Sequence, residues 1–383
     1  MPVLSLGCMR YQASWDRSKP VPRASQENLE NLLNHALELG INHIETARGY
    51  GTSEKQLGRI LPKLPRTEII LQTKVGPRTK RAEFRADVED SMKTLGVDFL
   101  DLLALHGLNN LEILRQGMKR TGSIMELVKL KEEGVVRTIG FATHGPPHSN
   151  IEAIRTGIFD YVNLLYSYIY QDNWKAILEA RKQDMGVFII SPNDKGGMLY
   201  KPTSKFSNLT RPLTPMQFND LFILSHRQVH TLSCGASKAS DLEEHIEALA
   251  KSKAWHEKMK RIRERLDKTM NRAVGASWAT RYAEGLPTWD KTPGDMNMHV
   301  ILWLRNLVLA YDMLEYGKMR YNLLGNAGHW FPGKKADRLD DLDKDALRRC
   351  LKHSPFKDVI IDFLRDTHRI LSGEEVHRLG GDH

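Results

Sequence analysis

The chain contains 383 residues, 41% of them hydrophobic, and its 56 Lys and Arg against 47 Asp and Glu give a net charge of +9. This length exceeds the roughly 250 residues of one (β/α)8 barrel. The sequence has no apolar run of about 18 residues, so we expect no membrane span. It shows no basic n-region and no cleavage site, so we expect no signal peptide. The three cysteines, Cys8, Cys234 and Cys350, are far apart and odd in number, which argues against a disulfide framework and favours a reducing, cytoplasmic compartment.

Apolar, strand-like segments recur along the first 240 residues, with helical stretches between them. They cover residues 3–8, 41–47, 68–75, 100–106, 138–143, 161–166, 186–191 and 229–234. Eight strand–helix units with the composition of parallel strands predict a closed (β/α)8 TIM barrel rather than an open sheet. A doubly wound sheet would need Gly-x-Gly-x-x-Gly after its first strand, and the sequence has no such turn there.

The most informative segment is residues 40–58, Gly-Ile-Asn-His-Ile-Glu-Thr-Ala-Arg-Gly-Tyr-Gly-Thr-Ser-Glu-Lys-Gln-Leu-Gly. It predicts a buried strand, a turn at two glycines, and a helix that Ser53 caps and that turns Leu57 and Ile60 inward. Glu45 then lies at the carboxyl end of the strand and Tyr50 in the loop after it. Barrel enzymes hold their catalytic residues at this rim.

Two further strands of the predicted barrel end in a polar side chain. The strand Ile-Ile-Leu-Gln-Thr-Lys-Val ends near Lys74, and Leu-Leu-Ala-Leu-His-Gly ends near His106. Together with the segment 40–58, these motifs resemble the signature of the aldo-keto reductase family. The resemblance implies that Glu45, Tyr50, Lys74 and His106 form the family's proton-transfer tetrad, with Glu45 at a position where the family usually has aspartate.

The tetrad chemistry has a physical reason. Reduction of a carbonyl by hydride transfer leaves an alkoxide that must take up a proton, and a general acid works best when its pKa lies near ambient pH. Unperturbed tyrosine has a pKa near 10, and a nearby lysine ammonium lowers it by favouring the phenolate. Tyr50 would therefore be the acid, Lys74 and Glu45 would tune it, and His106 would donate a hydrogen bond to the substrate oxygen.

The resemblance also implies a set of residues for a nicotinamide cofactor, with NADP(H) favoured over NAD(H). Thr143 and His144 at the end of the fifth strand and Asn163 within the sixth would bind the carboxamide, and the loop after the seventh strand offers Ser191, Lys195 and Gly196. The last strand leads into Gly235, Ala236, Ser237 and Lys238, whose amides suit the adenosine phosphate. Asp241 and His245 stand where the family commonly has Arg or Gln and Asn, and a carboxylate at Asp241 would disfavour a 2′-phosphate.

The sequence changes character after about residue 250, which predicts a barrel domain at 1–250 and a mainly helical extension at 251–383. An apolar stripe at helical spacing indicates one helix over residues 255–270, and others are expected over 300–311 and 359–371. Segments of this extension resemble the C-terminal module of a reductase branch fused to a ferredoxin-like domain. Cys350 is its only cysteine, whereas two [4Fe–4S] clusters need eight thiolates, so we expect no iron–sulfur cluster.

Other classes of ligand and function follow less well from the sequence. The extension carries 25 Lys and Arg against 19 Asp and Glu, but basic and acidic residues alternate and no aromatic–basic platform repeats, which argues against nucleic acid. No His or Cys pair has metal-ligand spacing. The sequence thus predicts an NAD(P)H-dependent enzyme that interconverts a small carbonyl compound and its alcohol, with the extension as a candidate surface for a protein partner. A non-catalytic, nucleotide-binding regulatory barrel and a redox-neutral isomerase with the same tetrad stay open.

Overall fold

The computed structural model of the protein describes residues 1–251, 255–325 and 331–374, and they form two compact units. Unit 1 contains residues 1–196 and 216–251. Unit 2 contains residues 197–215, 255–325 and 331–374. Each unit is described by itself below.

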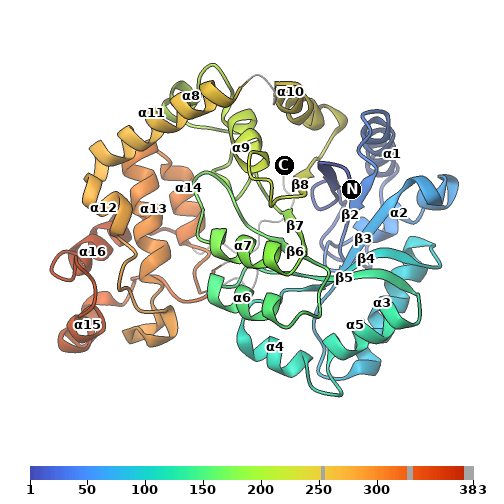
Figure 1. Cartoon of the computed structure of the whole chain (residues 1–383), viewed down its shortest axis with the longest axis horizontal. Helices are drawn as coiled ribbons and strands as arrows, with labels where there is room; N and C mark the ends of the chain where they lie inside the picture. Colours follow the sequence, from blue (N-terminus) through green and yellow to red (C-terminus); the bar gives the residue numbers. More distant parts are fainter. Residues whose placement is uncertain (252–254, 326–330, 375–383) are drawn as a thin grey trace. The chain divides into compact units, whose positions relative to one another are not determined.

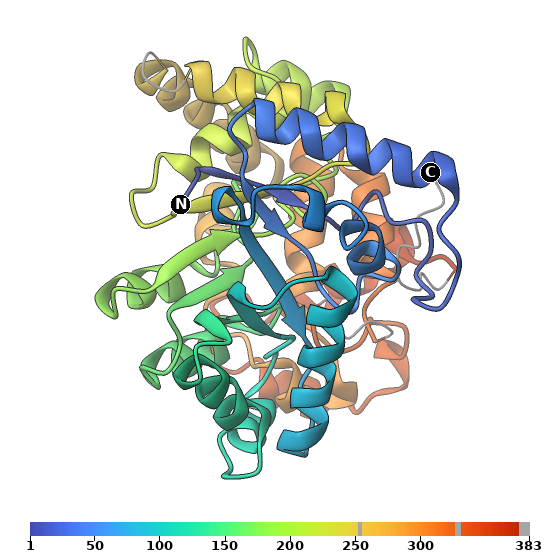
Figure 2. The same cartoon turned by 90° about the vertical axis from the view of Figure 1, so that its right-hand side faces the viewer.

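Unit 1 is a closed barrel of eight parallel strands in sequence order, because β1 pairs with both β2 and β8. The strands are β1 (Leu4–Gly7), β2 (His43–Glu45), β3 (Ile70–Val75), β4 (Leu100–His106), β5 (Val136–Ala142), β6 (Tyr161–Leu164), β7 (Gly186–Ile189) and β8 (Thr231–Gly235). Each lies within its predicted segment or, for β5 and β8, overlaps it. The (β/α)8 barrel is therefore confirmed (Figure 1 and, at right angles, Figure 2).

Helices surround these strands, and short 3₁₀ turns join several of them (Figure 1). The helices are α1 (Arg23–Glu38), α2 (Ser53–Leu57), α3 (Arg81–Leu95), α4 (Leu111–Gly117), α5 (Ser123–Glu132), α6 (Pro147–Arg155), α7 (Trp174–Lys182), α9 (Pro215–Leu224) and α10 (Glu243–Lys251). The barrel interior is filled by side chains. Tyr161 stacks on Phe188 with ring centroids 4.9 Å apart, and both pack with Leu102 and Ala104. A filled interior leaves the rim as the place for a site.

The helix after β2 starts differently from the prediction. Leu57 and Ile60 are buried as expected, but the N-cap residue of α2 is Thr52, which makes no side-chain cap hydrogen bond, and the helix begins at Ser53. The hydroxyl of Ser53 donates instead to the carbonyl oxygen of Cys8 at 2.7 Å and lies 2.8 Å from the hydroxyl of Thr46. Ser53 therefore ties the loop after β2 to the loop after β1, which a local capping argument does not reveal.

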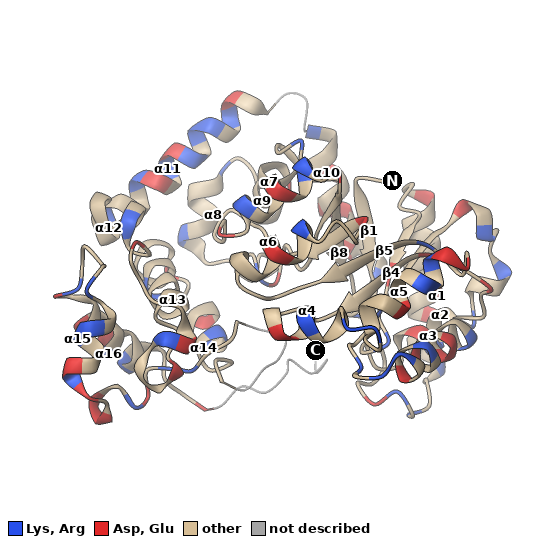
Figure 3. Cartoon of the chain, turned by 60° about the horizontal axis from the view of Figure 1, so that its bottom comes forward, with Lys and Arg blue, Asp and Glu red and all other residues tan. Residues whose placement is uncertain are grey.

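Unit 2 is helical, so the predicted helical extension is confirmed. Its helices are α8 (Ser204–Thr210), α11 (His256–Val274), α12 (Ala276–Arg281), α13 (Met298–Tyr311), α14 (Leu314–Tyr321), α15 (Lys344–Cys350) and α16 (Ile360–Leu371). Helix α13 is apolar on most sides and packs against α11, α14 and α16, which makes it the centre of the unit. Helix α11 buries Ile262 and Leu266 and exposes an alternation of basic and acidic residues (Figure 3). None of the described helices is long and apolar enough to cross a membrane.

Candidate active site

The ends of β2, β3 and β4 bring the four predicted catalytic side chains together. Glu45 pairs in register with Gln72, two residues before Lys74, and Lys74 pairs in register with Ala104, two residues before His106. Residues two apart on a strand share a face, so the strand pairing places these polar side chains at one end of the barrel.

Glu45 and Lys74 form a buried ion pair, with 3% and 1% of their surfaces exposed. Burial disfavours both charges, but their mutual attraction outweighs it. Although burial acts to raise the pKa of Glu45, the charge and hydrogen bond of Lys74 and a hydrogen bond from Ser233 hold that pKa below its usual value. Burial likewise acts to lower the pKa of Lys74, but Glu45 and Tyr50 raise it. The lysine thus stays charged.

Tyr50 lies directly against this ion pair. Lys74 Nζ donates to Tyr50 Oη at 3.2 Å, lies 4.7 Å from the centre of its ring, and donates to the carbonyl oxygen of Thr46 at 3.0 Å. The next residue, Gly51, fixes this loop. It has a φ of 53°, and a Cβ atom there would lie 1.9 Å from the carbonyl oxygen of Ser14, so only glycine fits.

His106, the last residue of β4, completes the group. Its ring meets that of Tyr50 edge to face, with centroids 5.6 Å apart and planes at 87°. Both side chains are half-buried, whereas Glu45 and Lys74 are buried. The arrangement therefore consists of a buried ion pair and two half-buried polar rings beside it.

Two contacts of the site escaped the sequence reasoning. Ser233 on β8 donates to Glu45 Oε2, and the Thr46 carbonyl accepts from Lys74. The signal for Ser233 was a polar residue between the apolar Leu232 and Cys234 of a barrel strand that runs beside β1. The Thr46 contact involves only backbone oxygen and leaves no trace in residue type.

The predicted carboxamide partner Asn163 lies inside the barrel, 1% exposed, at the position of β6 that pairs with Ala142. Its Oδ1 accepts from Gln72 Nε2 at 2.9 Å. Its Nδ2 is buried without a hydrogen-bond partner among the described residues. A buried amide without a partner is costly in a native structure, and it fits a ligand carbonyl that accepts a hydrogen bond.

Thr143 and His144 follow β5 and are engaged within the protein. The Thr143 hydroxyl lies 2.9 Å from the Leu108 carbonyl oxygen and 2.8 Å from Asn150 Oδ1, and it accepts from the Gly145 amide. Lys195 Nζ lies 3.0 Å from His144 Nε2, so the loop after β7 meets the loop after β5.

The loop after β7 has a tight backbone. Ser191 has a φ of 52°, and its carbonyl oxygen accepts from the Lys195 amide at 3.1 Å. A Cβ atom on Gly196 would lie 1.9 Å from the Pro192 carbonyl oxygen, so Gly196 serves the packing of the loop itself.

After β8, the side chain of Asp241 already accepts hydrogen bonds from two of the backbone amides that were predicted to bind a phosphate. Asp241 Oδ2 accepts from the Ser237 amide at 2.8 Å, the Ser237 hydroxyl at 2.7 Å and the Lys238 amide at 3.2 Å. Gly235, Ser237 and Lys238 are exposed, and Ala236 is buried. A phosphate at these amides would have to displace the carboxylate.

His245 is in the interior, 1% exposed, where its Nδ1 lies 2.5 Å from Asp220 Oδ2 and its Nε2 lies 3.0 Å from Asn193 Nδ2. Burial acts to lower the pKa of His245, but the Asp220 carboxylate raises it well above its usual value. The imidazole is thus committed to an internal ion pair.

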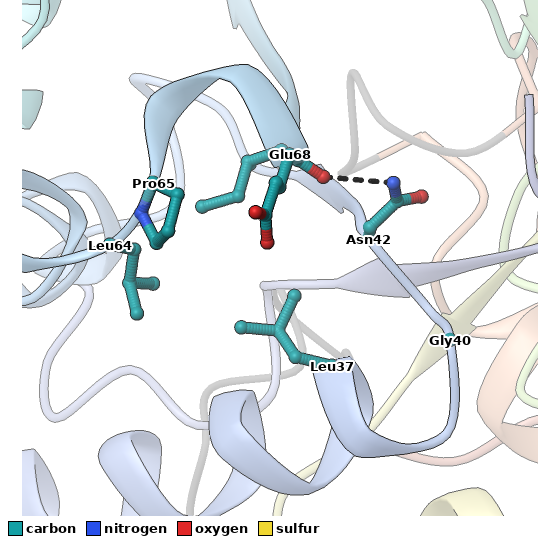
Figure 4. A pocket seen from close by; sticks show the side chains of 7 residues that line it. Leu37, Gly40, Asn42, Leu64, Pro65 and Glu68 are labelled. Carbon is teal, nitrogen blue, oxygen red and sulfur yellow. Dashed lines mark hydrogen bonds between the residues drawn. The ribbon is translucent and has the colours of Figure 1, made fainter.

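A pocket of about 270 Å³ lies elsewhere on the barrel (Figure 4). Leu37, Asn42, Leu64 and Glu68 are among the residues that line it, and they precede β2 and β3 in the chain. The pocket therefore lies at the opposite end of these strands from the tetrad. Among residues 1–251, 255–325 and 331–374, no group of three or more His, Cys, Asp and Glu side chains is arranged to hold a metal ion.

Comparison with known proteins agrees with this barrel. The sequence model of the aldo/keto reductase family matches residues 3–216. The chain belongs to this family. It is thus an NAD(P)H-dependent oxidoreductase by family.

Individual relatives are distant. The uncharacterized oxidoreductase YqkF of Bacillus subtilis is 27% identical over 278 residues, which cover 61% of this chain and 85% of that protein. The NADH-specific methylglyoxal reductase of Escherichia coli is 28% identical over 179 residues, and the match covers 41% of this chain and only 54% of that enzyme. The structure of an aldo-keto reductase from Klebsiella pneumoniae in complex with NADPH superposes with a TM-score of 0.55 at 19% identity, over 69% of this chain and 90% of that one. This last likeness concerns the fold alone.

Proposed function

We propose that the protein reduces a small carbonyl compound to its alcohol, or oxidises the alcohol, with Tyr50 as the general acid or base. The observation that carries this proposal is the 3.2 Å contact of Lys74 Nζ with Tyr50 Oη, next to the buried Glu45 carboxylate. A bound nicotinamide dinucleotide would supply or accept the hydride. Tyr50 would pass its proton to the oxygen of the substrate, and the half-buried His106 would donate a hydrogen bond to the same oxygen.

The proton-transfer role follows from electrostatics. The Lys74 ammonium stabilises the phenolate that Tyr50 becomes when it gives up its proton, and Glu45 keeps the ammonium in place. Asn163 Nδ2, which has no hydrogen-bond partner in the described part of the chain, fits the carbonyl oxygen of a nicotinamide carboxamide. The preference for NADP(H) stays a prediction. Asp241 argues against it, because its carboxylate already accepts hydrogen bonds from the amides proposed for the 2′-phosphate.

Spectroscopy tests this proposal without knowledge of the substrate. The purified protein is titrated with NADH and NADPH by fluorescence, then mixed with a panel of aldehydes, ketones and alcohols while the nicotinamide absorbance is followed. We expect saturable binding and turnover of at least one compound. Binding without turnover would favour a regulatory barrel, conversion without net redox would favour an isomerase, and no binding would contradict the proposal.

We propose that the protein is cytoplasmic and that residues 251–383 offer a surface for a protein partner. We also propose that these residues are a descendant of the ferredoxin-like module that has lost its clusters. The support is the cysteine count, since Cys350, at the end of α15, is the only thiol of this segment. We expect an anaerobic preparation to be colourless and free of iron. A brown protein with stoichiometric iron would contradict this part of the proposal.

A further inference from the structure

The buried amide of Asn163 is the end of a chain of hydrogen bonds that crosses the barrel interior. Gln72 Nε2 donates to Asn163 Oδ1 at 2.9 Å, and Gln72 Oε1 lies 3.1 Å from His43 Nε2. His43 Nδ1 lies 2.6 Å from Ser5 Oγ, which lies 2.8 Å from Thr231 Oγ1. All of these side chains are buried, and they come from β8, β1, β2, β3 and β6. We call them the interior hydrogen-bond chain.

The interior hydrogen-bond chain has a defined direction. Burial lowers the pKa of His43 to about 4, so the ring is neutral at pH 7, with one nitrogen that donates and one that accepts. The oxygen of Gln72 can only accept, which places the hydrogen of His43 on Nε2. Nδ1 then accepts from the Ser5 hydroxyl. The nitrogen of the same Gln72 amide, Nε2, donates to Asn163 Oδ1, which leaves Asn163 Nδ2 as the group offered to a ligand.

The same two strands carry both this chain and the tetrad. His43 is two residues before Glu45 on β2, and Gln72 is two residues before Lys74 on β3. Because alternate residues share a face, the two pairs form successive polar layers in the barrel. The outer layer holds the ion pair beside Tyr50, and the inner layer reaches Asn163.

We propose that His43 and Gln72 are positioning residues, which hold the Asn163 amide with Nδ2 turned toward the carboxamide oxygen of the cofactor. This inference rests on the proposed function and deepens it. An amide that could rotate would offer the ligand either oxygen or nitrogen, and only one of these binds a carbonyl oxygen. The inner layer would thus fix the nicotinamide ring relative to the proton donor in the outer layer.

A comparison of two ligands tests the inference. The ligands are NADH and ADP-ribose, which lacks the nicotinamide ring. If the wild type prefers NADPH, they are NADPH and 2′-phospho-ADP-ribose. Gln72→Leu should weaken the binding of the dinucleotide about five- to tenfold, the scale of one neutral hydrogen bond. It should leave the affinity for the fragment within about twofold of the wild-type value. In an Asn163→Leu background, Gln72→Leu should add nothing, because Gln72 acts through Asn163.

The matched control is Tyr161→Phe. Tyr161 is buried on β6 two residues before Asn163, and its hydroxyl has no partner among the described residues, so both ligands should bind as in the wild type. Retained binding of ADP-ribose also shows that each variant is folded. Equal weakening of both ligands, or unchanged binding of the dinucleotide by Gln72→Leu, would overturn the inference. Failure of the wild type to bind any dinucleotide would instead overturn the proposed function, and this inference with it.

Discussion

Lys74 Nζ lies 3.2 Å from Tyr50 Oη while it ion-pairs with the buried carboxylate of Glu45. This relationship joins the hydroxyl of a half-buried tyrosine to a charge that lies in the protein interior. It also makes two functions of the lysine separable. Lys74 neutralises a buried carboxylate, which concerns stability, and it favours the phenolate of Tyr50, which concerns catalysis.

Lys74→Met should reduce turnover by about 10²-fold, the scale of a general acid that has lost its tuning. The affinity for the cofactor should change little, because no described contact of Lys74 reaches Asn163 or residues 235–238. The pH dependence of the remaining activity should move toward the pKa of unperturbed tyrosine, about 10. Steady-state rates between pH 6 and 10 provide the measurement. An unchanged pH profile would contradict the claim that Lys74 tunes the proton transfer by Tyr50.

Glu45→Gln should destabilise the fold by about 3 kcal/mol at pH 7, because it leaves the Lys74 ammonium buried without its counter-charge. The pKa of Glu45 is lowered in the folded state, so its stabilising contribution is present above the unfolded pKa and disappears as the pH falls through the folded one. Urea unfolding measures both effects. Glu45→Asp is the control, which should keep activity, and a loss below about 1 kcal/mol for Glu45→Gln would argue against a strong ion pair.

His43 should give the acid side of the stability curve a recognisable slope. Its pKa is about 4 in the folded protein and about 6.5 in an unfolded chain, so the unfolded state takes up a proton first as the pH falls from 6.5 to 4. Stability should fall over this window by roughly 3 kcal/mol on account of this residue. Carboxylates titrate there too, and the difference between wild type and His43→Asn isolates the histidine. Parallel curves for the two proteins would contradict the assignment.

Asp241→Ala should raise the affinity for NADPH about tenfold and that for NADH much less. The substitution frees the amides of Ser237 and Lys238 and removes a negative charge from the proposed 2′-phosphate position. Lys238→Ala should weaken NADPH more than NADH if the ammonium meets that phosphate. Fluorescence titration of the three proteins gives both ratios. An equal change for both cofactors would place the 2′-phosphate away from this loop.

The sequence predicted the barrel well because buried parallel strands are continuous apolar runs, and β4 begins and ends at the predicted residues. It predicted the convergence of Glu45, Lys74 and His106 because the carboxyl ends of neighbouring parallel strands meet at one rim. Contacts of side chains with backbone groups were beyond it. The Ser53 hydroxyl binds Cys8 rather than its own helix, and Asp241 turns back on its own loop.

The interior hydrogen-bond chain was equally hidden. His43, Gln72 and Asn163 are ordinary polar residues in apolar strands, and they meet only because of the strand register and the closure of the barrel. The roles of all the site residues stay predictions until their variants are measured.

The central claim is that Tyr50 transfers the proton, and Tyr50→Phe tests it most directly. This substitution removes only the hydroxyl that lies 3.2 Å from Lys74 Nζ. With any carbonyl compound that the wild type reduces, we expect turnover to fall by about 10²-fold or more while the dissociation constant of the cofactor stays within about twofold. Turnover at the wild-type rate would contradict the claim and favour a different proton donor.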